Sequence, residues 1–169
     1  ALAPWAARVW PAGADPQSAR FGIRNDVAPG YLEFMGVAMR RGRTIQEGDV
    51  VGAPLVAVVN EPLAEQLWPG GDPIGRRFAI RPESGPNEGP RRDERVLEVV
   101  GVARRGAYWQ IGSDDTPYFW TAMYQECPPE VAVSLKGRTG AGAMVSVLRE
   151  NVRPDADEVR VFEPAPLTD

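Results

Sequence analysis

Apolar and polar residues alternate along several short stretches of the chain, as expected for strands with one buried face. Arg20–Asp26 (RFGIRND) and Arg77–Arg81 (RFAIR) alternate in this way. Leu55–Val59 (LVAVV) is a continuous apolar run, typical of a strand buried on both faces. Arg95–Ala103 (RVLEVVGVA) carries the strongest strand pattern, and Gly101 within it indicates a bend or bulge. Further strands are predicted at 117–124, 131–136 and 158–162.

A first helix is predicted after the strand at Arg20–Asp26. Pro29 suits the first turn of a helix, because its missing N–H would have no intrahelical partner there. The following turns carry an apolar face made of Tyr31, Leu32, Phe34 and Met35. We expect Gly36 to end this helix, since glycine adopts the left-handed conformation at little cost.

A second helix is predicted directly after the apolar run at 55–59. Asn60 is a favourable N-cap, and the apolar residues that follow recur at spacings of three and four. These residues are Leu63, Ala64, Leu67 and Trp68. Pro69 and two glycines end the helix. A third helix is predicted over Gly142–Val152, and residues 44–53 are expected to form a loop with a short helical turn.

The remaining segments lack a sustained period. Residues 1–19 are rich in Ala and Pro and are predicted to be a linker or irregular arm. Trp5 and Trp10 are unusual in a free linker, so they either dock on the body of the domain or belong near a membrane interface. Residues 82–93 are predicted to be an exposed hairpin loop. Because strands outnumber short helices, we predict an α+β fold of two small lobes with mixed or antiparallel sheets.

Composition narrows the classes of function. The 169 residues are 43% hydrophobic and 25% charged, the balance of a globular domain that can bury a core. A net charge of −4 disfavours nucleic acid or an anionic membrane as partner, because both need a basic face. No apolar run is long enough to cross a membrane. The chain begins with Ala1 rather than Met, so we expect it to be a piece of a longer protein.

Residue types that serve catalysis and metal binding are scarce. The chain has no histidine, which removes the commonest general base and metal ligand. Cys127 is its only cysteine, so neither an intrachain disulfide nor a cysteine metal cluster can form. Lys136 precedes its glycine and does not fit a phosphate-binding loop, and the three glycines of Trp68–Gly75 fit a helix end and turn better. We therefore predict no catalytic residue, no metal ligand and no cofactor.

Carboxylates and arginine pairs leave alternatives open. Asp114 and Asp115 could act as a buried acid–base pair or as weak calcium ligands, but a solvated turn is favoured. Strand alternation places Glu98 opposite its apolar neighbours, which favours solvent exposure over a catalytic role. Paired arginines could bind nucleic acid or phosphate, but solvated or salt-bridged sheet edges are favoured. These pairs are Arg40/Arg41, Arg76/Arg77, Arg91/Arg92 and Arg104/Arg105.

Aromatic residues gather in the stretch that ends at Trp120. They could line a pocket for an apolar ligand or form a patch that binds a partner or substrate. The candidates for this patch are Tyr108, Trp109, Tyr118 and Trp120. Core packing is expected to account for at least half of the aromatic group, because alternate residues of a strand face opposite sides.

A series of short motifs follows in a fixed order along the chain. It runs Pro29-Gly30-Tyr31, Gly36, Arg41-Gly42-Arg43, Val58-Val59-Asn60-Glu61, Leu67-Trp68-Pro69, Asp72-Pro73-Ile74-Gly75 and Val99-Val100-Gly101-Val102. In this order the motifs resemble the periplasmic core domain of MacB-like permeases, in particular the acidobacterial-type permease family of ABC exporters. FtsX- and LolC-type subunits are more distant relatives. The resemblance covers roughly residues 20–167, and Trp120-Thr121 departs from the family pattern.

The resemblance implies an architecture and a cellular context. The core domain, residues 20–169, would lie on the periplasmic side of the inner membrane, between the first two transmembrane helices of a permease. A β-rich lobe would be inserted at about residues 61–128. The implied partners are the flanking transmembrane helices, a second permease subunit, an ABC ATPase, and a periplasmic adaptor or outer-membrane channel. ATP would be hydrolysed on a separate cytoplasmic domain or subunit.

Two main hypotheses follow. The first is a non-catalytic domain of an ABC export permease that transmits conformational change and handles substrate or partner proteins outside the membrane. The alternative is a ligand-sensing extracytoplasmic domain of a membrane receptor that uses the aromatic group as its pocket. A stand-alone enzyme that works with carboxylates is disfavoured, because the usual acid–base residue is absent.

Overall fold

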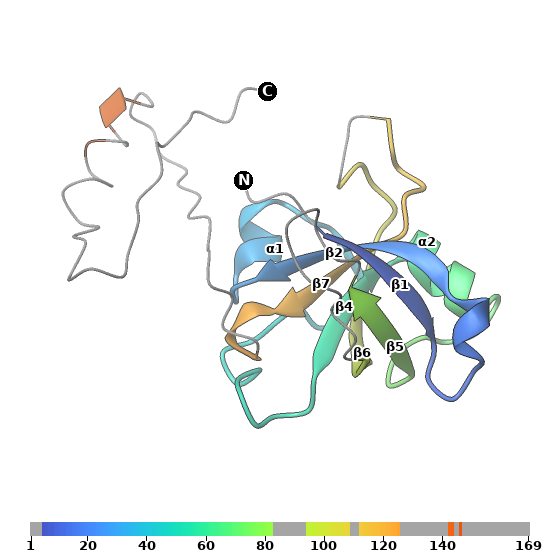
Figure 1. The fold of residues 1–169 in the computed structure, drawn as a ribbon. Coiled ribbons are helices and arrows are strands. Elements are labelled where there is room, and N and C mark those ends of the chain that lie inside the picture. The colour runs from blue at the N-terminus through green and yellow to red at the C-terminus, as the bar shows by residue number, and fades with distance from the viewer. Residues whose placement is uncertain (1–4, 83–93, 109–111, 126–141, 144–145, 147–169) are drawn as a thin grey trace. The chain divides into compact units, whose positions relative to one another are not determined.

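The computed structural model describes residues 5–82, 94–108, 112–125, 142–143 and 146, and the chain divides into two compact units, 1–130 and 131–169. The described residues of the first unit form seven strands, two short α-helices and two 3-10 turns (Figure 1). In chain order these are β1 (Trp5–Pro11), η1 (Pro16–Ser18), β2 (Arg20–Val27), α1 (Tyr31–Phe34), β3 (Met39–Gly42), β4 (Val56–Asn60), α2 (Glu61–Leu67), β5 (Arg77–Pro82), β6 (Arg95–Ala103), β7 (Tyr118–Ala122) and η2 (Met123–Gln125). This mixed sheet with few, short helices confirms the predicted α+β class.

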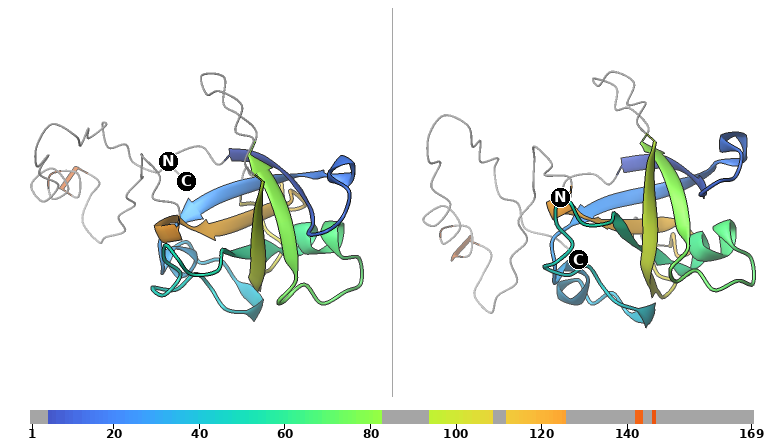
Figure 2. Two further views of the ribbon diagram at one scale, coloured as in Figure 1. Left: turned by 60° about the horizontal axis from the view of Figure 1, so that its bottom comes forward. Right: turned by 90° about the horizontal axis from the view of Figure 1, so that it is seen from below.

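The strands close into a barrel. Their order is β3-β6-β4-β7-β2-β1-β5, and a further pairing between β5 and β6 joins the sheet to itself. Six strands therefore form the wall, and β3 extends the edge of β6 beyond its pairing with β5. The pairs β2–β7 and β4–β6 are parallel, and all other pairs are antiparallel. Figure 2 shows the wall from two further directions.

Strand directions define two ends of this barrel. β1, β4 and β6 begin at one end, where β2, β5 and β7 finish, and we call it the polar end. The opposite end is covered by α2, which follows β4 directly, and we call it the helical end. The chain enters the barrel wall at the start of β1 and leaves it after β7, so both passages lie at the polar end.

The barrel interior is an apolar core. Phe119 of β7 and Phe78 of β5 meet edge to face with their ring centroids 5.5 Å apart. Trp68, at the end of α2, approaches Phe78 in the same way at 6.3 Å. Gly22 makes room for these rings, since a Cβ there would lie 3.4 Å from the ring of Phe119. The buried wall residues of this core include Ala7, Val9, Ala57, Val59, Ile80, Leu97 and Val99.

A second core lies outside the wall, over β2, β4 and β7. Tyr118 and Trp120 of β7 are each 2% exposed and pack with Leu32 of α1 and Ile45 of the following loop. Because Phe119 points into the barrel while its two neighbours point outward, β7 is buried on both faces.

Most predicted strands are confirmed. β2, β4, β5 and β6 match the predicted bounds to within about a residue, and β7 is a shorter strand inside the predicted range. The predicted second helix is confirmed as α2, whereas the first is reduced to the single turn α1 because Pro29 and Gly30 form a turn before it. Residues 44–53 contain turns but no helix. The predicted strands at 131–136 and 158–162, and almost all of the helix at 142–152, lie outside the described residues, as does the loop after Pro82.

The irregular arm expected for residues 1–19 is wrong for residues 5–11, which form β1. This strand sits between β2 and β5, and both neighbours satisfy its backbone hydrogen bonds. Trp10 docks on the body at 1% exposure, whereas Trp5 is 44% exposed. The range 61–128, expected as an inserted lobe, contributes β5, β6 and β7, and each of these pairs with a strand outside that range. This range and the strands before it therefore build one barrel.

Candidate functional site

The aromatic candidates for a binding patch are mostly core residues. Tyr118 and Trp120 are buried, with ring centroids 4.9 Å apart, and Tyr108 packs edge to face on Trp120 at 4.8 Å. The Tyr108 hydroxyl donates to the carbonyl of Arg104 at 2.6 Å. Burial raises the pKa of both tyrosines above its ordinary value. Two of the four residues therefore present no surface to a partner, and Trp109 lies outside the described residues.

The charged candidates form ion pairs on the surface. Asp115 pairs with Arg105 and is largely exposed, as a solvated turn predicts, and Asp114 beside it is exposed too. These aspartates line an open hollow of about 550 Å³ beside Phe21. Glu98 faces outward from β6 and pairs with Arg77 at 3.3 Å. The expected salt-bridged edges are confirmed for four arginines, with the pairs Arg40–Glu61, Arg41–Asp72, Arg77–Glu98 and Arg105–Asp115. Among the described residues no group of three or more carboxylates, cysteines or histidines is placed to hold a metal ion.

A network of charged and polar groups, buried except for part of Asp26, fills the polar end. Arg24 of β2 is 4% exposed, and its Nη2 and Nε lie 2.7 and 2.9 Å from one carboxylate oxygen of Asp26. The same Nε lies 3.1 Å from the hydroxyl of Thr121 on β7, which in turn donates to Asp26. All three side chains follow Gly22 and Phe119 on the inward face of their strands. This network thus closes the polar end of the barrel, whereas α2 closes the helical end.

Exposed apolar side chains gather on segments that adjoin the polar end. Val51 is 67% exposed, and its N–H donates to the carbonyl of Tyr124, itself 42% exposed. Six of the eight large hydrophobic residues exposed in the described part of the chain belong to segments next to this end. They are Trp5, Phe34, Met35, Val50, Val51 and Tyr124. Sequence reasoning did not identify this group, because its members come from four separate segments of the chain and no local pattern relates them.

The loop that carries Val50 and Val51 is fixed by an ion pair. Both carboxylate oxygens of Asp49 accept from the guanidinium of Arg43, at 2.8 and 2.9 Å, and one also accepts from the N–H of Gln46. Burial by itself raises the pKa of Asp49. The hydrogen bonds from Arg43 and Gln46 and the charge of Arg43 outweigh burial and hold this pKa below its ordinary value. The exposed valines are therefore presented on an ordered loop.

Asn60 joins the start of α2 to the start of β7. Its side chain is fully buried, and its Oδ1 accepts from the N–H groups of Leu63 at 3.0 Å and Tyr118 at 2.9 Å. Its Nδ2 donates to the carbonyl of Thr116 at 2.8 Å. The predicted N-cap is confirmed, and the additional bonds attach the helical end to β7.

Two motif glycines allow β3 and β6 to approach closely. Gly42 has φ +73°, and a Cβ there would lie 2.3 Å from the carbonyl oxygen of Val100. A Cβ at Gly101 would lie 2.1 Å from the carbonyl oxygen of Arg43. The register between β4 and β6 shifts beside Gly101, which confirms the predicted bulge.

Comparison with known proteins supplies the family. The family model described as the MacB-like periplasmic core domain matches residues 1–158 of the chain. The chain belongs to this family. No curated protein sequence matches the chain.

Two solved structures illustrate the similarity of this MacB-like periplasmic core domain to known proteins. The periplasmic region of MacB from Actinobacillus actinomycetemcomitans has a TM-score of 0.58 at 13% identity, over 88% of this chain and 62% of that one. The extracellular domain of the noncanonic ABC-type transporter YknZ from Gram-positive bacteria has a TM-score of 0.47 at 16% identity, over 71% and 51%. The likeness to MacB shows the fold, and the chain spans less than two thirds of either relative.

In this MacB-like domain the remaining motif residues build turns and caps. Gly30, Gly36 and Gly75 all have φ between 69° and 80°, a left-handed conformation that favours glycine. Pro73 is buried and Trp68 is 8% exposed. The motif residues of this kind are Pro29, Gly30, Tyr31, Gly36, Trp68, Pro69, Pro73 and Gly75. The motif residues thus serve turns, caps and packing within the domain.

The described part of the chain contains no helix long and apolar enough to cross a membrane.

Proposed function

We propose that this MacB-like domain is the non-catalytic extracytoplasmic part of an ABC-type export permease. In this role it transmits conformational change and handles substrate or partner proteins outside the inner membrane. ATP is hydrolysed on a separate cytoplasmic domain or subunit. Membership of the family over residues 1–158 supports this proposal, as does the fold shared with the periplasmic region of MacB.

The observation that carries the proposal is a closed barrel with a filled interior. Its first strand begins and its last strand finishes at the same end, the polar end. A closed sheet has no free edges within its wall and a packed interior resists compression. A displacement applied to the polar end is therefore passed on as movement of the whole barrel. The interior holds side chains instead of a substrate cavity, because Phe78, Phe119 and Trp68 fill it.

The polar end also offers the contacts that such a role needs. Exposed apolar side chains are typical of surfaces that meet another protein. The group around Val51 and Tyr124 lies where the chain enters and leaves the barrel. We assign it to contact with the rest of the permease, namely the flanking transmembrane helices and the second permease subunit. The ABC ATPase and a periplasmic adaptor or outer-membrane channel complete the proposed assembly.

A cross-linking experiment in the complete permease tests this role. Cys127 is first replaced by Ser, and Val51→Cys is then introduced into the complete protein together with its ABC ATPase. The yield of cross-link to the second subunit should change several-fold between ATP-free and ATP-bound membranes. Glu65→Cys, on the exposed face of α2 at the end away from the proposed contact, is the control and should give little cross-link in either state. Equal yields at Val51 in both states, or a parent protein without transmembrane segments on both sides of this chain, would contradict the proposal.

The receptor alternative loses its proposed pocket. It relied on the aromatic group, and Tyr118 and Trp120 pack inside the outer core instead of lining a cavity. The burial of these two residues favours the permease role over the receptor role.

A further inference from the structure

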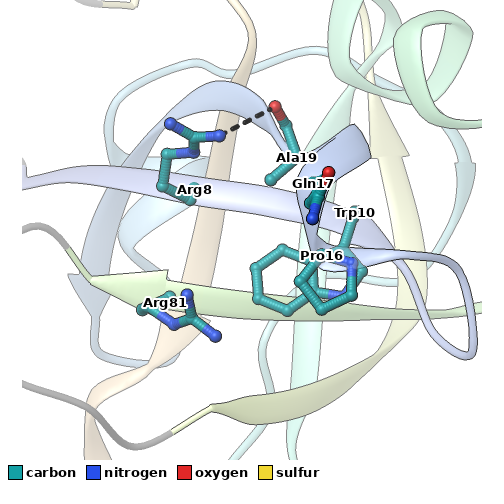
Figure 3. Close-up of a pocket in the computed structure, with 6 residues that line it drawn as sticks. All are labelled: Arg8, Trp10, Pro16, Gln17, Ala19 and Arg81. Carbon is teal, nitrogen blue, oxygen red and sulfur yellow. Dashed lines mark hydrogen bonds between the residues drawn. The ribbon is translucent and has the colours of Figure 1, made fainter.

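We propose that an open hollow beside Trp10 binds a phosphate monoester group between Arg8 and Arg81. The hollow has a volume of about 420 Å³ and lies on the outer face of β1 and β5 (Figure 3). Its other lining residues, Pro16, Gln17 and Ala19, come from η1 and the turn after it. The proposal rests on this hollow alone and does not depend on the transport role.

The two arginines are direct neighbours across a strand pair. Arg8 of β1 and Arg81 of β5 are register partners, so their side chains leave the same face of the sheet. Directly opposed residues have Cβ atoms about 5 Å apart, and like charges in this arrangement repel each other. An anion placed between the two guanidinium groups removes that repulsion and is attracted by both.

Neither guanidinium is satisfied by a close carboxylate of the described residues. The nearest one to Arg81 is Glu94, at 4.0 Å, and Arg8 makes a single long bond of 3.4 Å to the carbonyl of Ala19. Other arginines of the domain are paired more closely, such as Arg41 with Asp72 at 2.7 Å. The donors of Arg8 and Arg81 are therefore largely available to a ligand.

The walls of the hollow hold Arg81 in place. Its guanidinium carbon lies 5.5 Å from the centre of the Trp10 ring, within the range of a cation–π contact. Trp10 is itself only 1% exposed and lies beside Pro16 (Figure 3). Because Trp10 is fixed, Arg81 loses little freedom when a ligand binds, which favours affinity.

The arrangement of donors favours a tetrahedral dianion over a carboxylate. A carboxylate carries a single negative charge, and one guanidinium fork already balances that charge while binding both oxygens. A phosphate monoester has three terminal oxygens and a charge near −2 at neutral pH, so it can accept from both forks and match their combined charge. Its organic substituent can point out of the open hollow.

Titration calorimetry on the full chain at constant ionic strength tests this assignment, with inorganic phosphate and glycerol 3-phosphate as probes. Arg8→Gln and Arg81→Gln should each weaken binding about tenfold, because each removes charge-assisted hydrogen bonds. Arg8→Lys keeps the charge but loses the fork, so it should weaken binding several-fold. Arg77→Gln is the matched control, on the same face of β5 but paired with Glu98, and should bind as the unchanged chain does.

Three results would overturn the assignment. They are no binding of phosphate by the unchanged chain, an equal loss in Arg77→Gln and Arg8→Gln, and acetate that binds as tightly as phosphate. Vesicles of phosphatidylcholine with and without phosphatidic acid then identify the source of the phosphate. Retention by phosphatidic acid that Arg81→Gln abolishes indicates a lipid headgroup, and binding of glycerol 3-phosphate without retention indicates a soluble ester.

Discussion

The two ends of the barrel are closed by opposite kinds of chemistry. At the helical end, Leu63 and Leu67 of α2 and Trp68 directly after it cover the interior with apolar side chains. At the polar end, Arg24, Asp26 and Thr121 fill the interior with a hydrogen-bonded charge network. Burying apolar surface is favourable without any particular partner, whereas a buried charge is tolerated only when its partners are in place. The helical end is therefore expected to supply most of the stability. The polar end is expected to fix how β2 and β7 are held together beside the point where the chain leaves the barrel.

The largest effect is expected from the apolar side. Phe78→Ala removes a ring that contacts both Trp68 and Phe119, so it should lower the free energy of unfolding by about 4 kcal/mol. Phe78→Leu keeps most of the volume and should cost less than about half of that. Urea denaturation of the isolated chain measures both, and equal losses would show that the helical end is not tightly packed.

Breaking the charge network should cost slightly less. Arg24→Met leaves the carboxylate of Asp26 without its guanidinium, at an expected loss of about 3 kcal/mol in unfolding free energy. The triple variant Arg24→Met, Asp26→Leu, Thr121→Val replaces all three of these polar side chains with apolar ones, so it should recover at least half of that loss. If urea denaturation shows the triple variant to be less stable than Arg24→Met, the three side chains do not stabilise the polar end by satisfying one another's hydrogen bonds.

A smaller effect is expected at the seam between β3 and β6. Gly42→Ala should lower the free energy of unfolding by about 2 kcal/mol. The alanine would be strained in the left-handed conformation, and its Cβ would clash with the carbonyl oxygen of Val100. Gly13→Ala is the control, since Gly13 also has positive φ but a Cβ there would meet no atom within 4 Å. If both variants lose the same stability by calorimetry, the close approach of the two strands contributes nothing.

The smallest effect concerns the loop at the polar end. The pKa of Asp49 in the folded protein lies below its ordinary value of 3.8. The ionised carboxylate therefore contributes its full stabilisation at pH values above 3.8, and this stabilisation is lost as the pH falls through the lowered pKa. Asp49→Asn should cost about 1 kcal/mol at pH 7, because Arg43 is partly exposed and solvent screens the pair. Thermal melts from pH 7 down to acid pH should show the difference in melting temperature between the two proteins becoming smaller. A difference that grows as the pH falls would contradict a lowered pKa of Asp49.

The contrast between the ends also explains what sequence could predict. α2 is a local structure, so the N-cap Asn60 and the apolar spacing of the following residues were enough to place it. The charge network joins Arg24 to Thr121, which are 97 positions apart, and no local pattern relates them. β1 was missed for the same reason, because its strand state depends on pairing with β2 and β5. Likewise, the aromatic group was visible in sequence, but its burial follows from β7 being covered on both faces.

The central claim is that the barrel moves as one rigid body within a permease. Spin labels at Gln66→Cys on α2 and Tyr124→Cys at the polar end, with Cys127→Ser, report the length of the barrel by pulsed electron resonance. In the complete permease, with labelled chains diluted among unlabelled ones, this distance should be the same with and without ATP. A single label at Gln66→Cys on every copy should instead report a distance between barrels that changes with ATP. A barrel length that changes, or a distance between barrels that stays constant, would contradict the account.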